Sequence, residues 1–265
     1  MDYHNILSAV LSLTAMGLLF GVILGIASKV FAVHVDPRIQ EVTDALPGSN
    51  CGGCGYPGCA NYANAIVTNQ APLNKCMVGG TKAAEAISQI MGRPAPAVVQ
   101  HVAIVKCSAA CDVATQKYQY EGHASCRAAA SLSNGPELCP FACCGMGDCV
   151  KACQFDAIHL VNGVAVVDKN KCTGCGACAK ACPKGIILLR EPTCNLEVLC
   201  SNHQRGPDVV KACGLGCIAC GLCEKNCPNL AIQVVDNLAV IDPEKCVGCG
   251  TCVEICPRHT IRSLS

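Results

Sequence analysis

The chain lacks the large aromatic side chains on which most small domains build a core. It contains no Trp, and Phe, Tyr and Trp together make up only 3% of its 265 residues. Charged residues are also scarce, at 15%, and the net charge is +1. Because no basic stripe is available to follow a phosphate backbone, we expect no nucleic-acid partner.

Cysteine is abundant instead. The chain has 27 cysteines, an odd number that cannot all form disulfides, and most of them lie in runs too close for ordinary pairing. Such runs can wrap around a metal centre, and the free energy of metal binding then helps to fold modules that are too small to fold unaided. We therefore expect several small metal-binding modules rather than a secreted disulfide scaffold.

Residues 6–28 contain no charged side chain. As a helix they would extend about 34 Å, enough to cross a hydrocarbon core of about 30 Å. A cleaved signal peptide is the alternative, but a positive leader is missing and the apolar run is long for one. Asp2 precedes the run whereas Lys29 and Arg38 follow it, so a single-pass helix in the cell membrane would leave the C-terminal bulk in the cytoplasm.

The second half of the chain is an internal duplication, in which each position of one copy corresponds to a position of the other at a fixed offset in the numbering. Nine cysteines obey the same offset: Cys126, Cys139, Cys143, Cys149, Cys153, Cys172, Cys175, Cys178 and Cys182 correspond in order to Cys200, Cys213, Cys217, Cys223, Cys227, Cys246, Cys249, Cys252 and Cys256. In each copy we expect a short helix after each cysteine run, and a β-hairpin that turns at Asn162-Gly163 or at Asp236-Asn237.

Three runs, starting at Cys172, Cys217 and Cys246, have the spacing C-x2-C-x2-C-x3-C-P. They match bacterial two-cluster ferredoxins, in which the fourth cysteine of each run ligates the other 4Fe4S cluster, whereas zinc ribbons use separated C-x2-C pairs. The expected ligand sets are Cys217, Cys220, Cys223 with Cys256; Cys246, Cys249, Cys252 with Cys227; Cys172, Cys175, Cys178 with Cys153; and Cys143, Cys149 with Cys182.

The last of these sets is one ligand short, because Met146 stands where the second copy has Cys220. Cys139 or Cys144 can complete it. We prefer Cys139, which gives the run C-x3-C-x5-C-x3-C.

A further cysteine group precedes the duplication. Cys51, Cys54, Cys59 and Cys76 have the spacing C-x2-C-x4-C-x16-C, and the first three lie in the sequence NCGGCGYPGC. This segment resembles the small iron–sulfur domain of the B subunit of the Rnf electron-transport complex, and the likeness extends over nearly the whole chain. The resemblance implies a protein that accepts electrons from soluble ferredoxin through 4Fe4S clusters and passes them to partner subunits in the membrane, within a complex that couples electron flow from ferredoxin to NAD with ion transport.

Two other functions compete with this interpretation. One is an iron–sulfur subunit that anchors a different membrane enzyme, such as a formate dehydrogenase or a hydrogenase, and NCGGCGYPGC argues against it. The other is an iron-loaded sensor or storage protein, which the duplicated ferredoxin runs disfavour. The sequence has no G-x-G-x-x-G turn, no P-loop and no Ser/His/Asp arrangement, so we expect electron transfer without a catalytic site in this chain.

The predicted fold is α+β, with a transmembrane helix, a small helical iron–sulfur domain and two tandem two-cluster ferredoxin-like modules. Its expected parts are the anchor (1–35), the first 4Fe4S domain (36–92), a linker with additional cysteines (93–138), module 1 (139–190), a connector (191–212) and module 2 (213–265). Five clusters would use 20 of the 27 cysteines. The others could be buried thiols, or could supply a sixth cluster from Cys107, Cys111 and Cys126 with Cys200 or Cys213.

Overall fold

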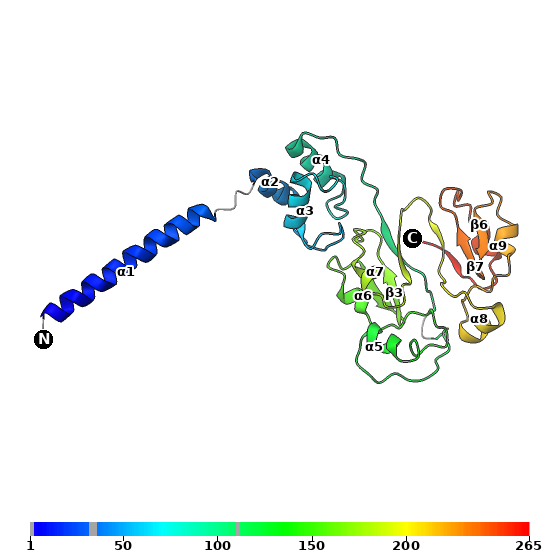
Figure 1. Ribbon diagram of the computed structural model, residues 1–265. Helices are drawn as coiled ribbons and strands as arrows, with labels where there is room; N and C mark the ends of the chain where they lie inside the picture. Colours follow the sequence, from blue (N-terminus) through cyan, green and yellow to red (C-terminus); the bar gives the residue numbers. More distant parts are fainter. Residues whose placement is uncertain (1–2, 32–35, 110–111, 265) are drawn as a thin grey trace.

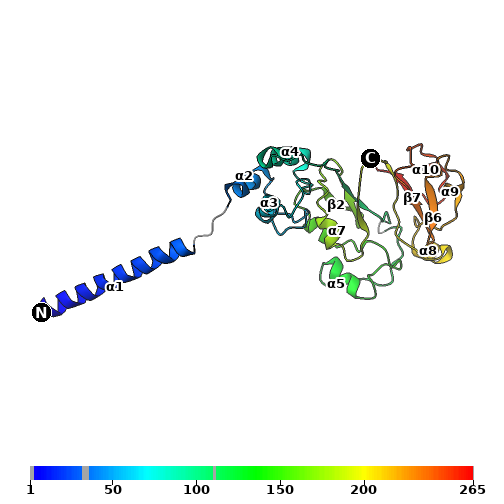
Figure 2. The same ribbon diagram turned by 45° about the horizontal axis from the view of Figure 1, so that its top comes forward.

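The protein consists of an N-terminal helix, a small helical domain and two ferredoxin-like modules (Figure 1). The structure, a computed structural model, describes residues 3–31, 36–109 and 112–264. The predicted α+β chain with an apolar N-terminal helix is confirmed. Both views place module 1 between the helical domain and module 2 (Figure 2).

The first helix, α1 (Tyr3–Val30), stands away from the other elements. Its apolar stretch, Ile6–Val30, has a mean hydropathy of 2.3, and the rest of the described chain buries none of it. It is the one helix among the described residues that is long and apolar enough to cross a membrane. Exposing such a large apolar surface to water is unfavourable. We therefore infer that α1 lies in an apolar environment.

The helical domain has a conventional apolar core. Its elements are α2 (Pro37–Ala45), α3 (Cys59–Val67) and α4 (Gly80–Met91). Asp36 caps α2, because its carboxylate accepts the N–H of Arg38 at 2.9 Å, and Pro37 presets the first turn. The largest fully buried side chains of this domain are Val42, Tyr62, Ile66 and Ile87.

The two modules repeat one arrangement of short helices and strands. Module 1 contains α6 (Asp148–Lys151), β2 (Ile158–Val161), β3 (Val164–Val167), α7 (Ala177–Ala181) and β4 (Ile187–Arg190). Module 2 contains α9 (Leu222–Lys225), β6 (Ile232–Val235), β7 (Leu238–Ile241), α10 (Thr251–Ile255) and β8 (Ile261–Ser263). The hairpins β2–β3 and β6–β7 turn at Asn162-Gly163 and Asp236-Asn237, as predicted. The short helices begin inside the cysteine runs rather than after them.

A strand from outside the cysteine runs completes each module. β1 (Val102–Val105) pairs with β4, and β5 (Leu196–Val198) pairs with β8, both antiparallel. Val105 is opposite Ile187, Val198 is opposite Ile261, and these two isoleucines correspond to each other in the duplication. β1 and β5 therefore occupy equivalent places, although the offset of the duplication does not relate them in sequence. The remaining helices, α5 (Cys126–Ser131) and α8 (Gly206–Ala212), precede the first cysteine run of each copy.

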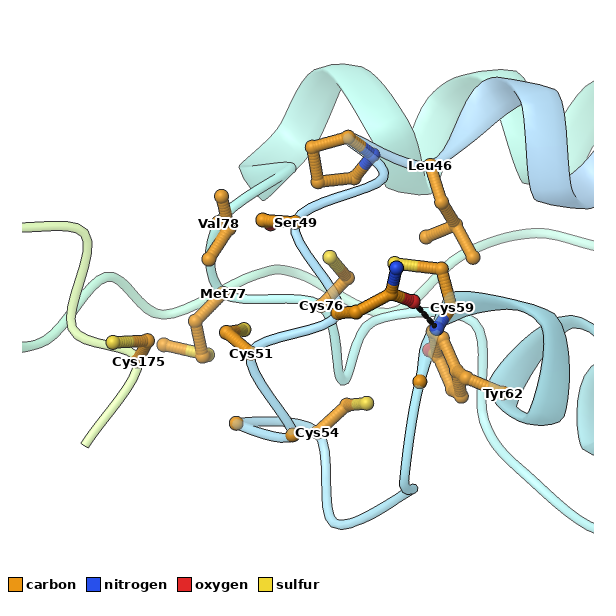
Figure 3. A pocket seen from close by; sticks show the side chains of 15 residues that line it. Leu46, Ser49, Cys51, Cys54, Cys59, Tyr62, Cys76, Met77, Val78 and Cys175 are labelled. Carbon is orange, nitrogen blue, oxygen red and sulfur yellow. Dashed lines mark hydrogen bonds between the residues drawn. The ribbon is translucent and has the colours of Figure 1, made fainter. Parts of the chain in front are cut away.

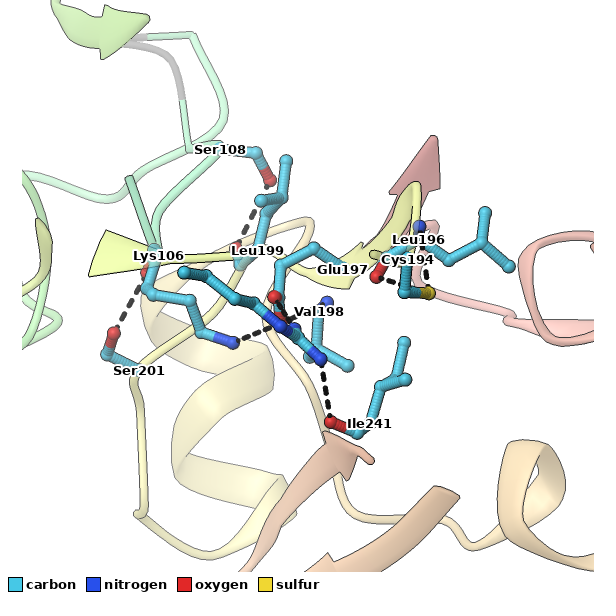
Figure 4. A network of polar contacts seen from close by, with 10 residues as sticks. Lys106, Ser108, Cys194, Leu196, Glu197, Val198, Leu199, Ser201 and Ile241 are labelled. Atoms are coloured by element: carbon cyan, nitrogen blue, oxygen red, sulfur yellow. Dashed lines mark hydrogen bonds and ion pairs between the residues drawn. The ribbon is translucent and has the colours of Figure 1, made fainter. Parts of the chain in front are cut away.

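A buried ionic network joins the two modules (Figure 4). Glu197 on β5 is 3% exposed, and its carboxylate accepts a hydrogen bond of 2.7 Å from Lys106 Nζ, just after β1. Its other oxygen pairs with Arg190, at the end of β4, and Arg190 also donates to the carbonyl of Ile241 at 3.1 Å. Because both cations come from module 1, the carboxylate fixes module 2 against it.

Candidate iron–sulfur sites

Four cysteines of the helical domain face one cavity (Figure 3). Cys51 and Cys54 lie in the glycine-rich loop before α3, Cys59 begins α3, and Cys76 precedes α4. Asn50 fixes this loop, since its Oδ1 accepts the N–H of Cys59 at 2.8 Å. Burial raises the pKa of the Cys76 thiol, and the three other thiols of the cavity raise it further.

Module 2 gathers its eight predicted ligands in two cavities. One is lined by Cys217, Cys220, Cys223 and Cys256, and the other by Cys227, Cys246, Cys249 and Cys252. Each cavity combines three cysteines of one run with the last cysteine of the other run. The chain turns tightly before α9 and α10 because Gly221 and Gly250 adopt φ values of 73° and 84°. Burial raises the pKa of Cys223 and of Cys252 to about 11.

Module 1 has the same crossed arrangement with one exchange. Cys178 lies near Cys172, Cys175 and Cys153, and burial, with a smaller effect of these thiols, raises its pKa to about 11. The second group contains Cys143, Cys149 and Cys182, and the additional thiol among them is Cys126. Burial, followed by the neighbouring thiols, raises the pKa of Cys149 to about 12.

Cys126 therefore lies at this group, whereas Cys139, which the sequence favoured, lines a different cavity. Helix α5 brings Cys126 in from the segment before the module. It is tied to α6 because Asp148 accepts a hydrogen bond of 2.8 Å from Ser125 Oγ and one of 3.2 Å from the N–H of Arg127. The exchange compensates for Met146. Sequence reasoning missed it because the duplication pairs Cys126 with Cys200, which lies elsewhere, and no local pattern marks Cys126.

The remaining cysteines differ in where they lie. Cys144 is buried near Cys126 and Cys143, and Cys194 is buried against Cys246. Cys111, one of the residues expected in a sixth cluster, lies outside the described residues. The other four, Cys107, Cys139, Cys200 and Cys213, line a further cavity.

The donor sets suit iron–sulfur clusters. Every described cysteine is a free thiol. A single zinc ion, with Zn–S bonds of about 2.3 Å, would hold its thiolates about 3.8 Å apart. Among the described residues, no three His, Cys, Asp or Glu side chains lie close enough together to bind one metal ion. Four thiols spread around one cavity instead match the wider 4Fe4S unit. Backbone N–H groups also reach sulfur, as from Ala157 to Cys153 at 3.5 Å and from Ala231 to Cys227 at 3.3 Å.

The helical domain and module 1 meet at their cysteine groups. Cys175 lines the same cavity as the four cysteines of the helical domain (Figure 3). Gly53 packs so closely that a Cβ there would lie 2.7 Å from the carbonyl oxygen of Cys175. Lys180 Nζ also donates to the carbonyl of Gly52 at 3.4 Å. The two groups are thus direct neighbours in space.

Family models match both parts of this arrangement. The model described as "Putative Fe-S cluster" matches residues 46–78, which include the cysteines of the helical domain. The model "4Fe-4S binding domain" matches residues 165–188 and 239–262, two segments that correspond to each other in the duplication.

Three relatives are similar over most of their length. The chain is 42% identical over 241 residues to the B subunit of the ion-translocating oxidoreductase complex of Methanosarcina acetivorans, covering 91% of each chain. It is 42% identical to the B subunit of the proton-translocating ferredoxin:NAD(+) oxidoreductase complex of Clostridium ljungdahlii, over 90% of this chain and 85% of the relative. It is 44% identical to the B subunit of the Na(+)-translocating ferredoxin:NAD(+) oxidoreductase complex of Acetobacterium woodii, over 88% and 70%.

Proposed function

This chain belongs to the family of B subunits of ion-translocating ferredoxin:NAD oxidoreductase (Rnf) complexes, and from that membership we propose a specific path for its electrons. Electrons enter from soluble ferredoxin at module 2, pass through module 1 and leave through the helical domain towards membrane-embedded partner subunits. The observation that carries the proposal is the contact of the helical-domain cavity with Cys175 of module 1.

Five cysteine groups hold the clusters in this proposal. They are Cys51, Cys54, Cys59 and Cys76; Cys172, Cys175, Cys178 and Cys153; Cys143, Cys149, Cys182 and Cys126; Cys217, Cys220, Cys223 and Cys256; and Cys246, Cys249, Cys252 and Cys227. A 4Fe4S cluster, when bound, takes up and releases one electron at a time. The cysteine thiolates of these groups would ligate the iron, and the surrounding residues would shield the cluster from water and donate N–H groups to its sulfur, which would tune its potential.

Module 2 is the better docking point for an external donor. Cys220 and Cys249 are exposed, whereas the other described cysteines are buried or half-buried. A partner that docks on module 2 can therefore approach its clusters closely. At the opposite end, α1 anchors the chain as a single membrane span, and Lys29 and Arg38 after it favour the cytoplasmic side for the modules.

The path can be tested with Cys59→Ala in the assembled complex. The variant removes one ligand of the helical domain and leaves the ligands of both modules, so ferredoxin should still reduce the modules. Onward transfer should fall at least about tenfold, measured as ferredoxin-dependent NAD reduction. Cys144→Ala, at a buried cysteine outside the five groups, is the control. Unchanged NAD reduction in Cys59→Ala would show that the first cluster is not on the path.

A further inference from the structure

Four buried cysteines that none of the five groups uses line one cavity between the two modules. Cys107, Cys139, Cys200 and Cys213 are each only 7–9% exposed. Cys107 follows β1, Cys139 lies between α5 and α6 at the start of module 1, and Cys200 and Cys213 flank α8. Three segments that are distant in sequence, around residues 107, 139 and 200–213, thus bring their thiols to one place.

The four residues form two pairs that occupy equivalent places in the two copies. Cys139 and Cys213 correspond directly in the duplication. Cys107 follows Val105 by two residues and Cys200 follows Val198 by two, and these valines face the equivalent isoleucines of β4 and β8. The cavity therefore lies where the two copies meet with approximate twofold symmetry.

Hydrogen bonds across this junction are reciprocal. Ser201 Oγ donates to the carbonyl of Lys106 at 3.0 Å, and Ser108 Oγ donates to the carbonyl of Leu199 at 3.5 Å. Ser108 and Ser201 directly follow Cys107 and Cys200 in sequence. Lys106 and Leu199, whose carbonyls accept the bonds, directly precede the same two cysteines. The same contact is therefore made twice, once in each direction (Figure 4).

Each of the four sulfur atoms accepts a backbone N–H from two residues further along the chain. The donors to Cys200 and Cys213 are Asn202 and Leu215, both at 3.4 Å, and those to Cys107 and Cys139 are Ala109 and Phe141. Cys143, Cys217 and Cys246 of the ferredoxin runs receive the same bond, from Gly145, Ala219 and Gly248. Asn202 Nδ2 adds a donor to Cys139 at 3.3 Å. The cavity thus offers four thiols with the donor pattern of the other cysteine groups.

We propose that Cys107, Cys139, Cys200 and Cys213 bind a sixth 4Fe4S cluster, which links the two modules. Cys107 accepts the N–H of Cys143 in a module 1 group, and Cys200 lies near Cys217 in a module 2 group. The site therefore lies between a cysteine group of module 1 and a cysteine group of module 2, on the proposed path. This inference rests on the proposed function, because it assumes that the neighbouring groups hold clusters. It replaces the ligand set expected from the sequence, in which Cys126 took part.

The test is a count of iron and sulfide in the full-length chain, loaded anaerobically in detergent. Six clusters correspond to about 24 iron atoms per chain and five clusters to about 20. We expect about 24 in the unmodified protein, and about 20 in Cys107→Ala and in Cys200→Ala, with Mössbauer spectra that show only 4Fe4S centres. Cys194→Ala is the matched control, since Cys194 is 5% exposed and also accepts the N–H two residues on but does not line the cavity.

The outcomes separate the two proposals. About 20 iron atoms in the unmodified chain, with no change in Cys107→Ala and Cys200→Ala, would overturn the sixth site and leave the five-cluster relay intact. About eight would overturn the relay as well. If an alanine variant fails to fold, the iron content of the unmodified protein decides the question alone. About 24 iron atoms per chain would support the sixth site, and about 20 would exclude it.

Discussion

Gly53 of the helical domain packs directly on the backbone of Cys175 in module 1. A Cβ on Gly53 would lie 2.7 Å from the carbonyl oxygen of Cys175 and 3.2 Å from its Cα, and backbone atoms cannot turn aside as a flexible side chain can. The φ of Gly53 lies outside the left-handed region, so its backbone suits any residue. Glycine is needed at this position for the close approach alone.

Gly53→Ala should therefore separate the two cysteine groups without unfolding either domain. We expect unchanged iron content and slower electron transfer from module 1 to the helical domain, by roughly tenfold, because such transfer depends steeply on distance. Lys180→Ala removes only the 3.4 Å bond to Gly52 and should have a smaller effect. Stopped-flow reduction by ferredoxin measures both variants. Equal rates in Gly53→Ala and the unmodified protein would mean that this contact does not carry the electrons.

Cys126→Ala should cost one cluster, because it removes the fourth thiol of the group of Cys143, Cys149 and Cys182. We expect a loss of about four iron atoms per chain. Cys144→Ala is the matched comparison, since Cys144 is adjacent in space and also buried, and it should keep the full content. If iron were lost only in Cys144→Ala, the fourth ligand would be Cys144, one of the two residues that the sequence allowed, and not Cys126.

Glu197→Gln should weaken the junction between the modules. It leaves Lys106 and Arg190 without their carboxylate in a largely buried place, and loss of one partner of such a pair costs about 3 kcal/mol. Urea unfolding, followed by the visible absorption of the clusters, should show a lower midpoint. Asp156→Asn breaks the exposed pair with Lys171 and should leave that midpoint unchanged. Equal midpoints in all three proteins would indicate that the modules unfold independently of Glu197.

Removal of residues 1–30 should give a water-soluble protein with its full iron content. α1 is not buried by the rest of the described chain, and the apolar cores lie in residues 42–261. Sedimentation without detergent and an iron count test this. Loss of most of the iron would show that the helix belongs to the folding unit.

Local signals predicted much of the fold. The hairpin turns at Asn162-Gly163 and Asp236-Asn237 follow from turn chemistry, and the apolar helix follows from a run without charge. The strands β1 and β5 were not predicted, because each pairs with a strand far along the chain and carries no local signal. The structure places Cys126 beside Cys143, Cys149 and Cys182, where the sequence favoured Cys139. The fixed offset of the duplication assumes that corresponding residues occupy equivalent places in both copies. This assumption fails where Met146 stands in place of a cysteine.

The pairing of β1 with β4 has a consequence for the order in which the chain can mature. The thiols of module 2 lie within 40 residues (217–256), and those of module 1, with Cys126 included, lie within 57 residues (126–182), so loop closure in each module is short. β1 can pair with β4 only after the whole of module 1 has been synthesised. The ion pair between Lys106 and Glu197 can form only after β5 has been synthesised as well. Iron acquisition can therefore begin locally, module by module, while the junction between the modules is completed last.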